Sequence, residues 1–415
     1  MAGANIREWE ALPGALAGWL NDVFGCRVEL EGGDHPALGW RRSGLMAVSG
    51  LADGPGLVAP APLTTFADAA LSGLRRLSGS STLPANGALL LGERARLMGL
   101  ARRGAVSANG SCRLLPVADG HVALNLPRDD DWDLVTALVQ EPVEDWDGLA
   151  ALVRSWRRDA LVERGRLLGL AIAPDREPPI VTAPCRVEPL GDGGSRRGRP
   201  PLVVDLSSLW AGPLAGALLA DAGARVVKVE SRGRPDGARG GDPRFFALMN
   251  GGKESRLFDF RDEADLQRLR TLVGEADIVI EASRPRALAQ LGIDARAQAR
   301  RGATWLSITA HGRDGEAGDA IGFGDDAAVA GGLAARMRQA WGVTIFAGDA
   351  IADPLTGILA ALAGWASWTS GGGRLVSLAM ADVVAFGCGF GLDDPEAWRA
   401  LTMVDDAPLY PMRSA

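Results

Sequence analysis

Lysine is almost absent from this 415-residue sequence, in which Lys228 and Lys253 are the only two lysines among 44 basic residues. The 51 acidic residues give a net charge of −7, and no basic tract is present, which argues against bulk binding of nucleic acid or of an anionic membrane. Tyrosine is as scarce, with Tyr410 alone beside 12 tryptophans. These biases are mostly compositional. The two lysines are still candidates for a structural or ligand role, because a compact ammonium is used there instead of a guanidinium.

Cysteine and histidine are also rare, and neither residue type is clustered. The four cysteines show no CxxC spacing, which favours neither a metal site nor a disulfide framework. The longest apolar run, 358–368, is too short to span a bilayer. The first twenty residues carry Arg7, Glu8 and Glu10 where a signal peptide would be apolar. We therefore expect a soluble, cytoplasmic protein with no metal and with neither a membrane nor a nucleic-acid partner.

Composition divides the chain into five parts. Residues 1–106 are rich in Gly and Ala and begin with an amphipathic helical pattern, and residues 107–175 have the pattern of a small α+β domain with a hairpin turn. Residues 176–200 are rich in Pro, Gly and Arg, which is typical of a linker. Residues 201–390 form the larger domain, and residues 391–415 form a C-terminal tail.

The larger domain alternates between apolar β-rich runs and helical patterns. Strands are expected at 202–206, 225–230, 278–281 and 304–309, and helices at 214–222 and 262–273. This alternation predicts an α/β fold, a Rossmann-like doubly wound parallel sheet accompanied by the smaller α+β domain.

A weak internal repeat relates the two ends of the chain. Residues 43–50, 67–73 and 87–91 resemble residues 331–335, 352–357 and 373–377, in the same order. The preserved order favours a duplicated piece of one fold over chance similarity in Gly/Ala-rich sequence. We therefore expect residues 1–106 to be a truncated, degenerate copy of a large-domain segment.

The strongest local feature is the run from Val203 to Gly216, which predicts a strand, a tight loop and a helix beginning near Pro213. Free N–H groups at such a helix start can bind an anion. The next strand ends in Lys228-Val-Glu230, close to where a dinucleotide fold places an acid for a ribose. The GxGxxG fingerprint is absent, so an NAD-dependent oxidoreductase is a weak alternative.

The same run resembles the opening of the family III CoA-transferases, which include formyl-CoA transferase and the L-carnitine dehydratase/bile-acid-inducible type. Further matching motifs follow in family order at 250–255, 276–281, 307–312, 353–361 and 373–378. Residues 107–175 resemble the small domain of that family. The resemblance implies that residues 201–390 are a Rossmann-like CoA-binding catalytic domain.

The order of the parts departs from the family pattern. Family members run from the large domain to the small domain, whereas here the small domain and a partial copy come first, which indicates a fusion or permutation. Two family chains interlock into a dimer. The resemblance therefore implies a homodimer, although the fused order leaves a monomer open.

The resemblance also implies that Asp353 is the catalytic nucleophile, because the family carries that residue as the Asp of Asp-x-x-x-Gly at a helix start. Here Asp353 and Gly357 match. CoA transfer needs a carboxylate that attacks a thioester and forms a mixed anhydride and then an enzyme–CoA thioester, with N–H groups to stabilise the oxyanion. From the residues alone, an Asp before Pro is also a common helix N-cap. Asp68 lies five residues before Gly73, not four, so residues 1–106 are expected to be non-catalytic.

Two further acids, Asp325 and Asp326, fall near the site in the family layout. From the residues alone, a solvated acidic loop is the favoured interpretation. Racemase members place a His–Asp pair in this neighbourhood. Phe323 and Gly324 stand there instead, which disfavours α-proton racemisation.

The CoA-binding positions of the family carry over with several substitutions. The matched residues are Leu209, Trp210, Ala211, Gly212, Ser231, Arg232, Phe258, Arg261, Ala282, Ser283, Arg284 and Gln290. Trp210 stands where a polar residue is common, so we expect a narrower and more apolar acyl pocket. Ser231 and Gln290 replace basic residues, and Arg232 could substitute in phosphate pairing.

We therefore expect an acyl-CoA:carboxylate CoA-transferase that uses coenzyme A, as acyl-CoA, and a carboxylic acid, through an aspartyl-CoA thioester and anhydride. Because basic residues at CoA-binding positions are replaced, a catalytically altered family member that only binds acyl-CoA remains an alternative. An acyl-CoA racemase and an NAD-dependent oxidoreductase are weaker alternatives.

Overall fold

A seven-stranded sheet forms the centre of the larger domain in the computed structural model, which describes residues 7–191, 194, 198–391, 394–404 and 406–414. In spatial order its strands are β5 (Arg186–Pro189), β11 (Arg374–Ala379), β10 (Thr304–Thr309), β9 (Ile278–Glu281), β6 (Leu202–Asp205), β7 (Arg225–Ser231) and β8 (Glu254–Phe258). Neighbouring strands are parallel except β5, which is antiparallel to β11. The predicted doubly wound α/β fold is confirmed.

The order of the strands determines where a ligand can bind. From β6 the chain runs outward through β7 and β8, then returns to the other side of β6 through β9, β10 and β11. The direction of winding thus reverses between β6 and β9. Open α/β sheets bind ligands outside the carboxyl ends of the strands at such a point. The loop that follows β6, residues 206–210, lies there.

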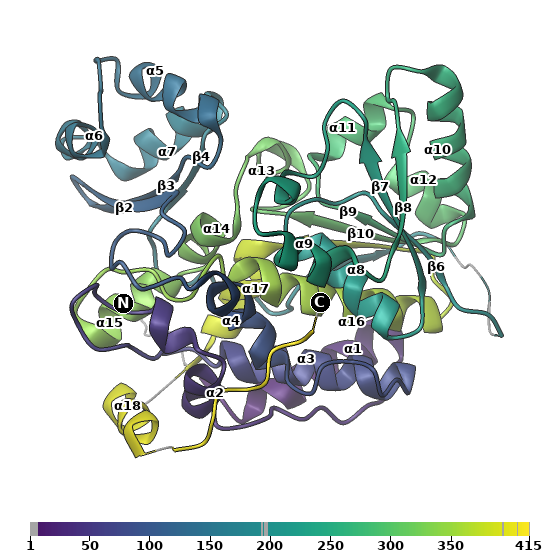
Figure 1. Ribbon diagram of the computed structural model, residues 1–415, viewed down its shortest axis with the longest axis horizontal. Coiled ribbons are helices and arrows are strands. Elements are labelled where there is room, and N and C mark those ends of the chain that lie inside the picture. Colours follow the sequence, from purple (N-terminus) through teal and green to yellow (C-terminus); the bar gives the residue numbers. More distant parts are fainter. Residues whose placement is uncertain (1–6, 192–193, 195–197, 392–393, 405, 415) are drawn as a thin grey trace.

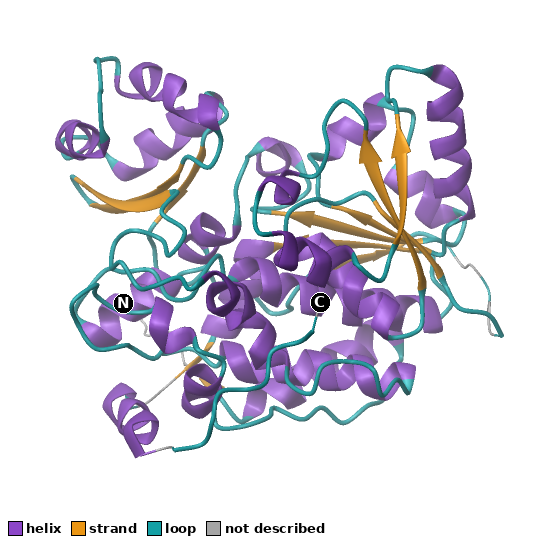
Figure 2. Cartoon of the chain, in the orientation of Figure 1, coloured by secondary structure: helices purple, strands orange, loops and turns teal. Residues whose placement is uncertain are grey.

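Helices cover both faces of this sheet (Figures 1 and 2). One face packs against α8 (Ala211–Asp221) and α16 (Ala352–Thr369), and the other against α10 (Glu263–Glu275) and α12 (Ala295–Arg300). This two-sided cover explains the continuous apolar runs of the strands: Val203 contributes to the core on one face, and Val204 to the core on the other.

Residues 1–106 add a further layer of helices behind α16. These helices are α1 (Ala11–Phe24), α2 (Pro36–Arg42), α3 (Leu63–Ser78) and α4 (Gly87–Met98). Helix α3 packs along α16, and its buried residues share one continuous core with those of α8 and α16. Among the described residues this segment has one strand, the two-residue β1 (Arg7–Glu8), which pairs with β12 (Phe390–Gly391).

The smaller sheet lies within the predicted small domain. It is antiparallel and consists of β2 (Cys112–Val117), β3 (Gly120–Asn125) and β4 (Ala171–Pro174), with the helices α5 (Val135–Val139), α6 (Trp146–Val153) and α7 (Arg158–Leu167) on one face. Its other face packs on α14 (Gly324–Ala330) and α15 (Leu333–Trp341). The small domain therefore contacts the larger one through the helix that begins at Gly324.

The remaining helices of the larger domain are α9 (Pro243–Asn250), α11 (Pro285–Gln290), α13 (Gly315–Asp319) and α17 (Met380–Cys388). Helix α18 (Pro395–Val404) lies in the predicted C-terminal tail and packs against α2. Part of the predicted linker 176–200 is ordered as β5, a pairing that its polar, Pro-rich composition does not indicate. The division of the chain into five parts stays a prediction. Within the described residues, no helix is both long and apolar enough to cross a membrane.

Candidate functional site

Asp353 lies in the first turn of α16, where the helix approaches α8 closely. Gly357, one turn further along, allows this approach: a Cβ at residue 357 would lie 2.6 Å from the Ala211 carbonyl oxygen and 3.1 Å from the Leu214 Cβ. Real Cβ atoms rarely come so near, so a larger residue would push α16 away from α8. The Asp-x-x-x-Gly spacing therefore places the carboxylate beside the beginning of α8.

Backbone N–H groups from two helix starts lie close to the Asp353 carboxylate and lower its pKa. They belong to Ala211 at the beginning of α8 and Gly324 at the beginning of α14. The side chain is half-buried, and desolvation raises its pKa to about 6, against the lowering effects of the Arg94 guanidinium and the two N–H groups. At neutral pH the group is therefore mostly ionised, yet closer to its protonated form than an ordinary aspartate.

Three more aspartates surround Asp353, and all three are buried. Asp349 forms an ion pair with Arg94, and Asp325 accepts hydrogen bonds from the backbone of Ala350 (2.9 Å) and from the Asn109 amide (3.2 Å). Burial raises the pKa of Asp325 and of Asp326 to about 7. The interpretation of Asp325 and Asp326 as a solvated loop is therefore wrong, because the small domain covers the first turn of α14 that carries them.

The loop after β6 reaches the site in a constrained conformation. Leu209 has a φ of +71°, which is uncommon for a residue other than glycine, and its N–H donates to Asp236 Oδ1 at 2.9 Å. Gly212 has no room for a side chain, because a Cβ there would overlap the side chain of Ser207. The N–H of Ala211 that contacts Asp353 is thus positioned by a loop with little freedom.

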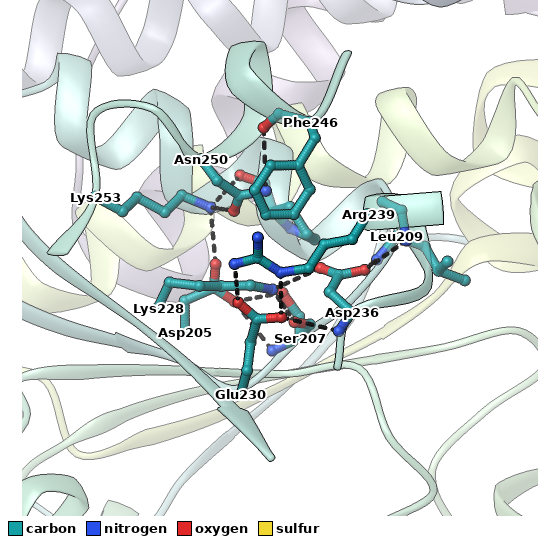
Figure 3. A network of polar contacts seen from close by, with 12 residues as sticks. Asp205, Ser207, Leu209, Lys228, Glu230, Asp236, Arg239, Phe246, Asn250 and Lys253 are labelled. Carbon is teal, nitrogen blue, oxygen red and sulfur yellow. Dashed lines mark hydrogen bonds and ion pairs between the residues drawn. The ribbon is translucent and has the colours of Figure 1, made fainter. Parts of the chain in front are cut away.

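Both lysines of the chain belong to a buried ion-pair network beneath this loop (Figure 3). Lys228 Nζ donates to Asp236 Oδ2 at 2.8 Å and to the Ser207 carbonyl, and Lys253 Nζ donates to Asp205 Oδ2 at 2.8 Å. Burial alone would raise the pKa of Asp205, but the two ammonium groups lower it to about 2. Lys228 therefore binds the loop that positions Ala211, through the Ser207 carbonyl, and Lys253 binds the end of β6 before that loop and Pro213 after it.

Trp210 closes the apolar side of the site. Its ring is buried and makes an edge-to-face contact with Phe245, with centroids 5.3 Å apart. The Arg94 guanidinium lies 4.5 Å from the centroid of the Trp210 ring. Trp210 thus adds buried aromatic surface directly before Ala211, and the expected narrow acyl pocket stays a prediction.

The other predicted CoA-binding residues lie on loops or strand ends at the carboxyl edge of the sheet. Ser231 pairs with Phe258 at the ends of β7 and β8, and the Arg232 N–H donates to the Phe258 carbonyl at 2.8 Å. Arg261 follows β8, Ala282 and Ser283 follow β9, and Arg284 and Gln290 flank α11. Arg232, Arg261 and Arg284 are exposed, whereas Phe258 is buried. Positive groups accessible to phosphates thus surround this edge.

Sequence reasoning missed Arg94 and Asp349. Arg94 comes from α4, in the segment expected to be non-catalytic, and its partner lies 255 positions away in the sequence. No local motif indicates such a pair. The internal repeat is the one available signal, since it relates residues 1–106 to the part of the chain that carries Asp349.

Comparison with known proteins places the matching region over the larger domain. The model of CoA-transferase family III matches residues 201–394. Succinate–glutarate CoA-transferase of Agrobacterium fabrum is 31% identical over 208 residues, which cover 45% of this chain and 52% of that protein. Succinyl-CoA–D-citramalate CoA-transferase of Chloroflexus aurantiacus is 29% identical over 189 residues, which cover 42% and 47% of the two chains.

The chain spans about half the length of these curated relatives. Among solved structures, a CaiB/BaiF family protein from Brucella suis is 27% identical, with a TM-score of 0.38, over 52% of this chain and 59% of that one.

Proposed function

We propose, from the premise that residues 201–394 are a CoA-transferase family III segment, that this chain transfers coenzyme A between carboxylic acids with Asp353 as nucleophile. One observation carries the proposal. The half-buried Asp353 carboxylate lies at the carboxyl edge of the sheet, against the backbone N–H groups of Ala211 and Gly324. A carboxylate in this setting can attack a carbonyl carbon.

In the first half of the reaction, an Asp353 oxygen attacks the carbonyl carbon of the acyl-CoA thioester. The carbon–sulfur bond breaks, CoA leaves as the thiolate, and a mixed anhydride of Asp353 and the donor acid forms. The thiolate then attacks the Asp353 carbonyl carbon, which releases the donor as its carboxylate and leaves an Asp353–CoA thioester. The acceptor carboxylate completes the transfer by the same steps in reverse order.

The two backbone N–H groups have a defined role in this sequence. Each tetrahedral intermediate at the Asp353 carbonyl carbon carries a negative charge on its oxygen. The N–H groups of Ala211 and Gly324 lie close enough to the carboxylate to lower its pKa, so they are placed to stabilise that oxyanion. We expect Trp210, which is buried directly before Ala211, to limit the access of water to the anhydride.

Coenzyme A would lie along the loops after β6–β9. Leu209, Trp210, Ala211 and Gly212 would face the thioester, and Phe258 with Arg232, Arg261 and Arg284 would face the adenine and its phosphates. Ser231, Ala282, Ser283 and Gln290 complete the proposed binding positions. Exposed arginines suit phosphate binding because the guanidinium pairs bidentately with phosphate oxygens.

The test is capture of the enzyme–CoA thioester. The full chain is incubated with succinyl-CoA or acetyl-CoA and digested, and the mass of the peptide that contains Asp353 is measured with and without hydroxylamine, which releases CoA as the thiol and leaves a hydroxamate on Asp353. We expect a CoA adduct at Asp353. Transfer is followed from succinyl-CoA to glutarate and from acetyl-CoA to oxalate, and Asp353→Asn should lower it at least about 1000-fold.

Asp68→Asn is a matched control. Asp68 is also a buried helical aspartate, it accepts a hydrogen bond from the Ala88 backbone at 2.9 Å, and burial raises its pKa to about 7. The variant should keep the adduct at Asp353. If Asp353→Asn retains transfer, the assignment of the nucleophile is wrong. If acyl-CoA raises the Tm of the wild type but no acyl-CoA and acid pair is turned over, the chain binds acyl-CoA without transferring it.

A further inference from the structure

The loop that leads into α16 is fastened to the N-terminal segment at three places. Phe346 N–H donates to the Gly104 carbonyl at 3.0 Å, and Gly348 N–H donates to Ser49 Oγ at 2.9 Å. Asp349 receives two hydrogen bonds from Arg94, one from Nε at 2.7 Å and one from Nη2 at 2.5 Å. Residues 1–106 therefore hold the loop 346–350 together with Asp325 of α14, and Asp349 lies four positions before the proposed nucleophile.

Arg94 connects this loop with the loop that follows β6. Its side chain is 18% exposed, and that of Asp349 is fully buried. The guanidinium also lies over the rings of Trp210 and Phe245, with distances of 4.5 and 5.9 Å to their centroids. One side chain from α4 thus contacts both the loop before α16 and the loop after β6.

Arg94 is also the positive charge that faces the acidic cluster. Asp349, Asp325 and Asp353 all act on its guanidinium, and Asp326 lies in the same cluster next to Asp325 and Asp353. Three of these carboxyl groups, those of Asp349, Asp325 and Asp353, therefore share one guanidinium from α4, whereas Asp326 acts on the Arg166 guanidinium of α7.

We propose that Arg94 is a positioning residue of the Asp353 site, which fixes the two loops beside the nucleophile and favours its carboxylate form. The inference rests on the proposed function for its catalytic meaning. It assigns a role in the site to residues 1–106, which the sequence indicated as non-catalytic.

The direction of the electrostatic effect can be stated. Arg94 lowers the pKa of Asp353 and Asp349 raises it, and the effect of Arg94 is the larger of the two. Removal of Arg94 should therefore raise the pKa of Asp353 whether Asp349 then stays ionised or takes up a proton. With a carboxylate as nucleophile, the acidic limb of the rate profile should move to higher pH.

The experiment compares Arg94→Met, Arg94→Lys and the double variant Arg94→Met/Asp349→Asn with the wild type. The first readout is an NMR titration of aspartate carboxyl ¹³C, in which the Asp353 signal is assigned from Asp353→Asn. The second is the pH dependence of succinyl-CoA to glutarate transfer. Arg94→Met should raise both midpoints by about one pH unit, so that relative activity at pH 6 falls roughly fivefold against pH 8.

The other variants separate charge from packing. Arg94→Lys keeps the charge and should restore the Asp353 midpoint, although it loses the bidentate pair and so part of the rate. The double variant leaves no unpaired charge on Asp349, which guards against a folding defect, and it should still show the raised midpoint. Arg76→Met changes an exposed arginine of the same segment and should shift neither midpoint.

Two outcomes distinguish this inference from the proposed function. If the wild type transfers CoA and Asp353→Asn does not, but neither Arg94→Met nor the double variant moves the midpoints, Arg94 has no such role and the proposed function stands. If the NMR midpoint of Asp353 moves as expected while the wild type transfers no CoA, the charge relationship stands and the proposed function fails.

Discussion

Gly324 and Asp353 lie so close that a methyl group on residue 324 would overlap the Oδ2 atom of the Asp353 carboxylate. It would overlap the Ala350 carbonyl oxygen as well. Glycine is therefore required here for space, because the backbone N–H of residue 324 has to reach the carboxylate.

Gly324→Ala should disable CoA transfer while the chain still folds. The added methyl group displaces the carboxylate from its N–H donors, and a misplacement of about 1 Å at a reacting group can cost about 100-fold in rate. We expect a loss of that size in the transfer assay, with a decrease in the free energy of unfolding of about 1–3 kcal/mol.

The control for this substitution is Gly18→Ala. Gly18 is an exposed residue inside α1, and a Cβ there would meet nothing within 4 Å. Activity should be unchanged and stability should increase by about 0.5–1 kcal/mol, since alanine favours a helix more than glycine does. Full activity of Gly324→Ala would show that close contact with residue 324 is not needed.

Lys228→Met should destabilise the chain strongly. Lys228 and Asp236 are 2% and 0% exposed, so loss of the ammonium leaves a buried carboxylate without its charge partner. We expect the free energy of unfolding in urea to fall by about 3–5 kcal/mol. The double variant Lys228→Met/Asp236→Asn should lose less, because asparagine keeps Oδ1 as the acceptor for Leu209.

Arg225→Met provides the comparison with a surface pair. Arg225 donates to Glu254 from a side chain that is 62% exposed, and such pairs contribute below about 1 kcal/mol. If Arg225→Met and Lys228→Met have similar effects, the network in Figure 3 does not depend on its burial.

Asp326→Asn should stabilise the chain at alkaline pH. Burial raises the pKa of Asp326 to about 7, so the folded chain binds this proton more tightly than the unfolded chain does. The contribution of such a group is complete below the ordinary pKa near 4 and is lost as the pH rises to 7. Asparagine keeps Oδ1, which accepts from Asn125 and Phe323 at 2.9 Å each.

The measurement is urea unfolding of the wild type and Asp326→Asn at pH 5 and pH 8. At pH 8 the variant should have a larger free energy of unfolding than the wild type. At pH 5 its advantage over the wild type should be smaller by roughly 2–3 kcal/mol. For Asp159→Asn the pH dependence of the stability change should have the opposite sign, because a hydrogen bond from Arg158 lowers the pKa of Asp159. The effect should be small, since this group is exposed. A pH-independent difference for Asp326→Asn would mean that Asp326 is ionised throughout.

Sequence patterns predicted the sheet because its strands depend on local signals, whereas Asp353 as nucleophile stays a prediction that the family resemblance implies. The strands β6, β7, β9 and β10 are apolar runs buried on both faces, and their predicted positions agree with the structure within a residue. Asp353 is expected from its spacing to Gly357, which the packing of α16 on α8 explains.

The missed features depend on contacts between distant parts of the chain. The burial of Asp325 and Asp326 requires the small domain, and the pairing of Arg94 with Asp349 requires α4 to pack beside α9 and α16. In the sequence alone, charged residues that are buried by such long-range contacts cannot be told apart from those on a solvated surface.

The burial of both lysines has a practical consequence for proteolysis. A protease that cleaves only after lysine has two sites in the whole chain, and the side chains there are 2% and 1% exposed. One site lies inside β7 and the other just before β8, so neither can enter a protease active site until that side of the sheet opens. Cleavage by such an enzyme would therefore report unfolding of the β7–β8 edge of the sheet, while fraying of the N-terminal helices or of the small domain would leave the chain uncut.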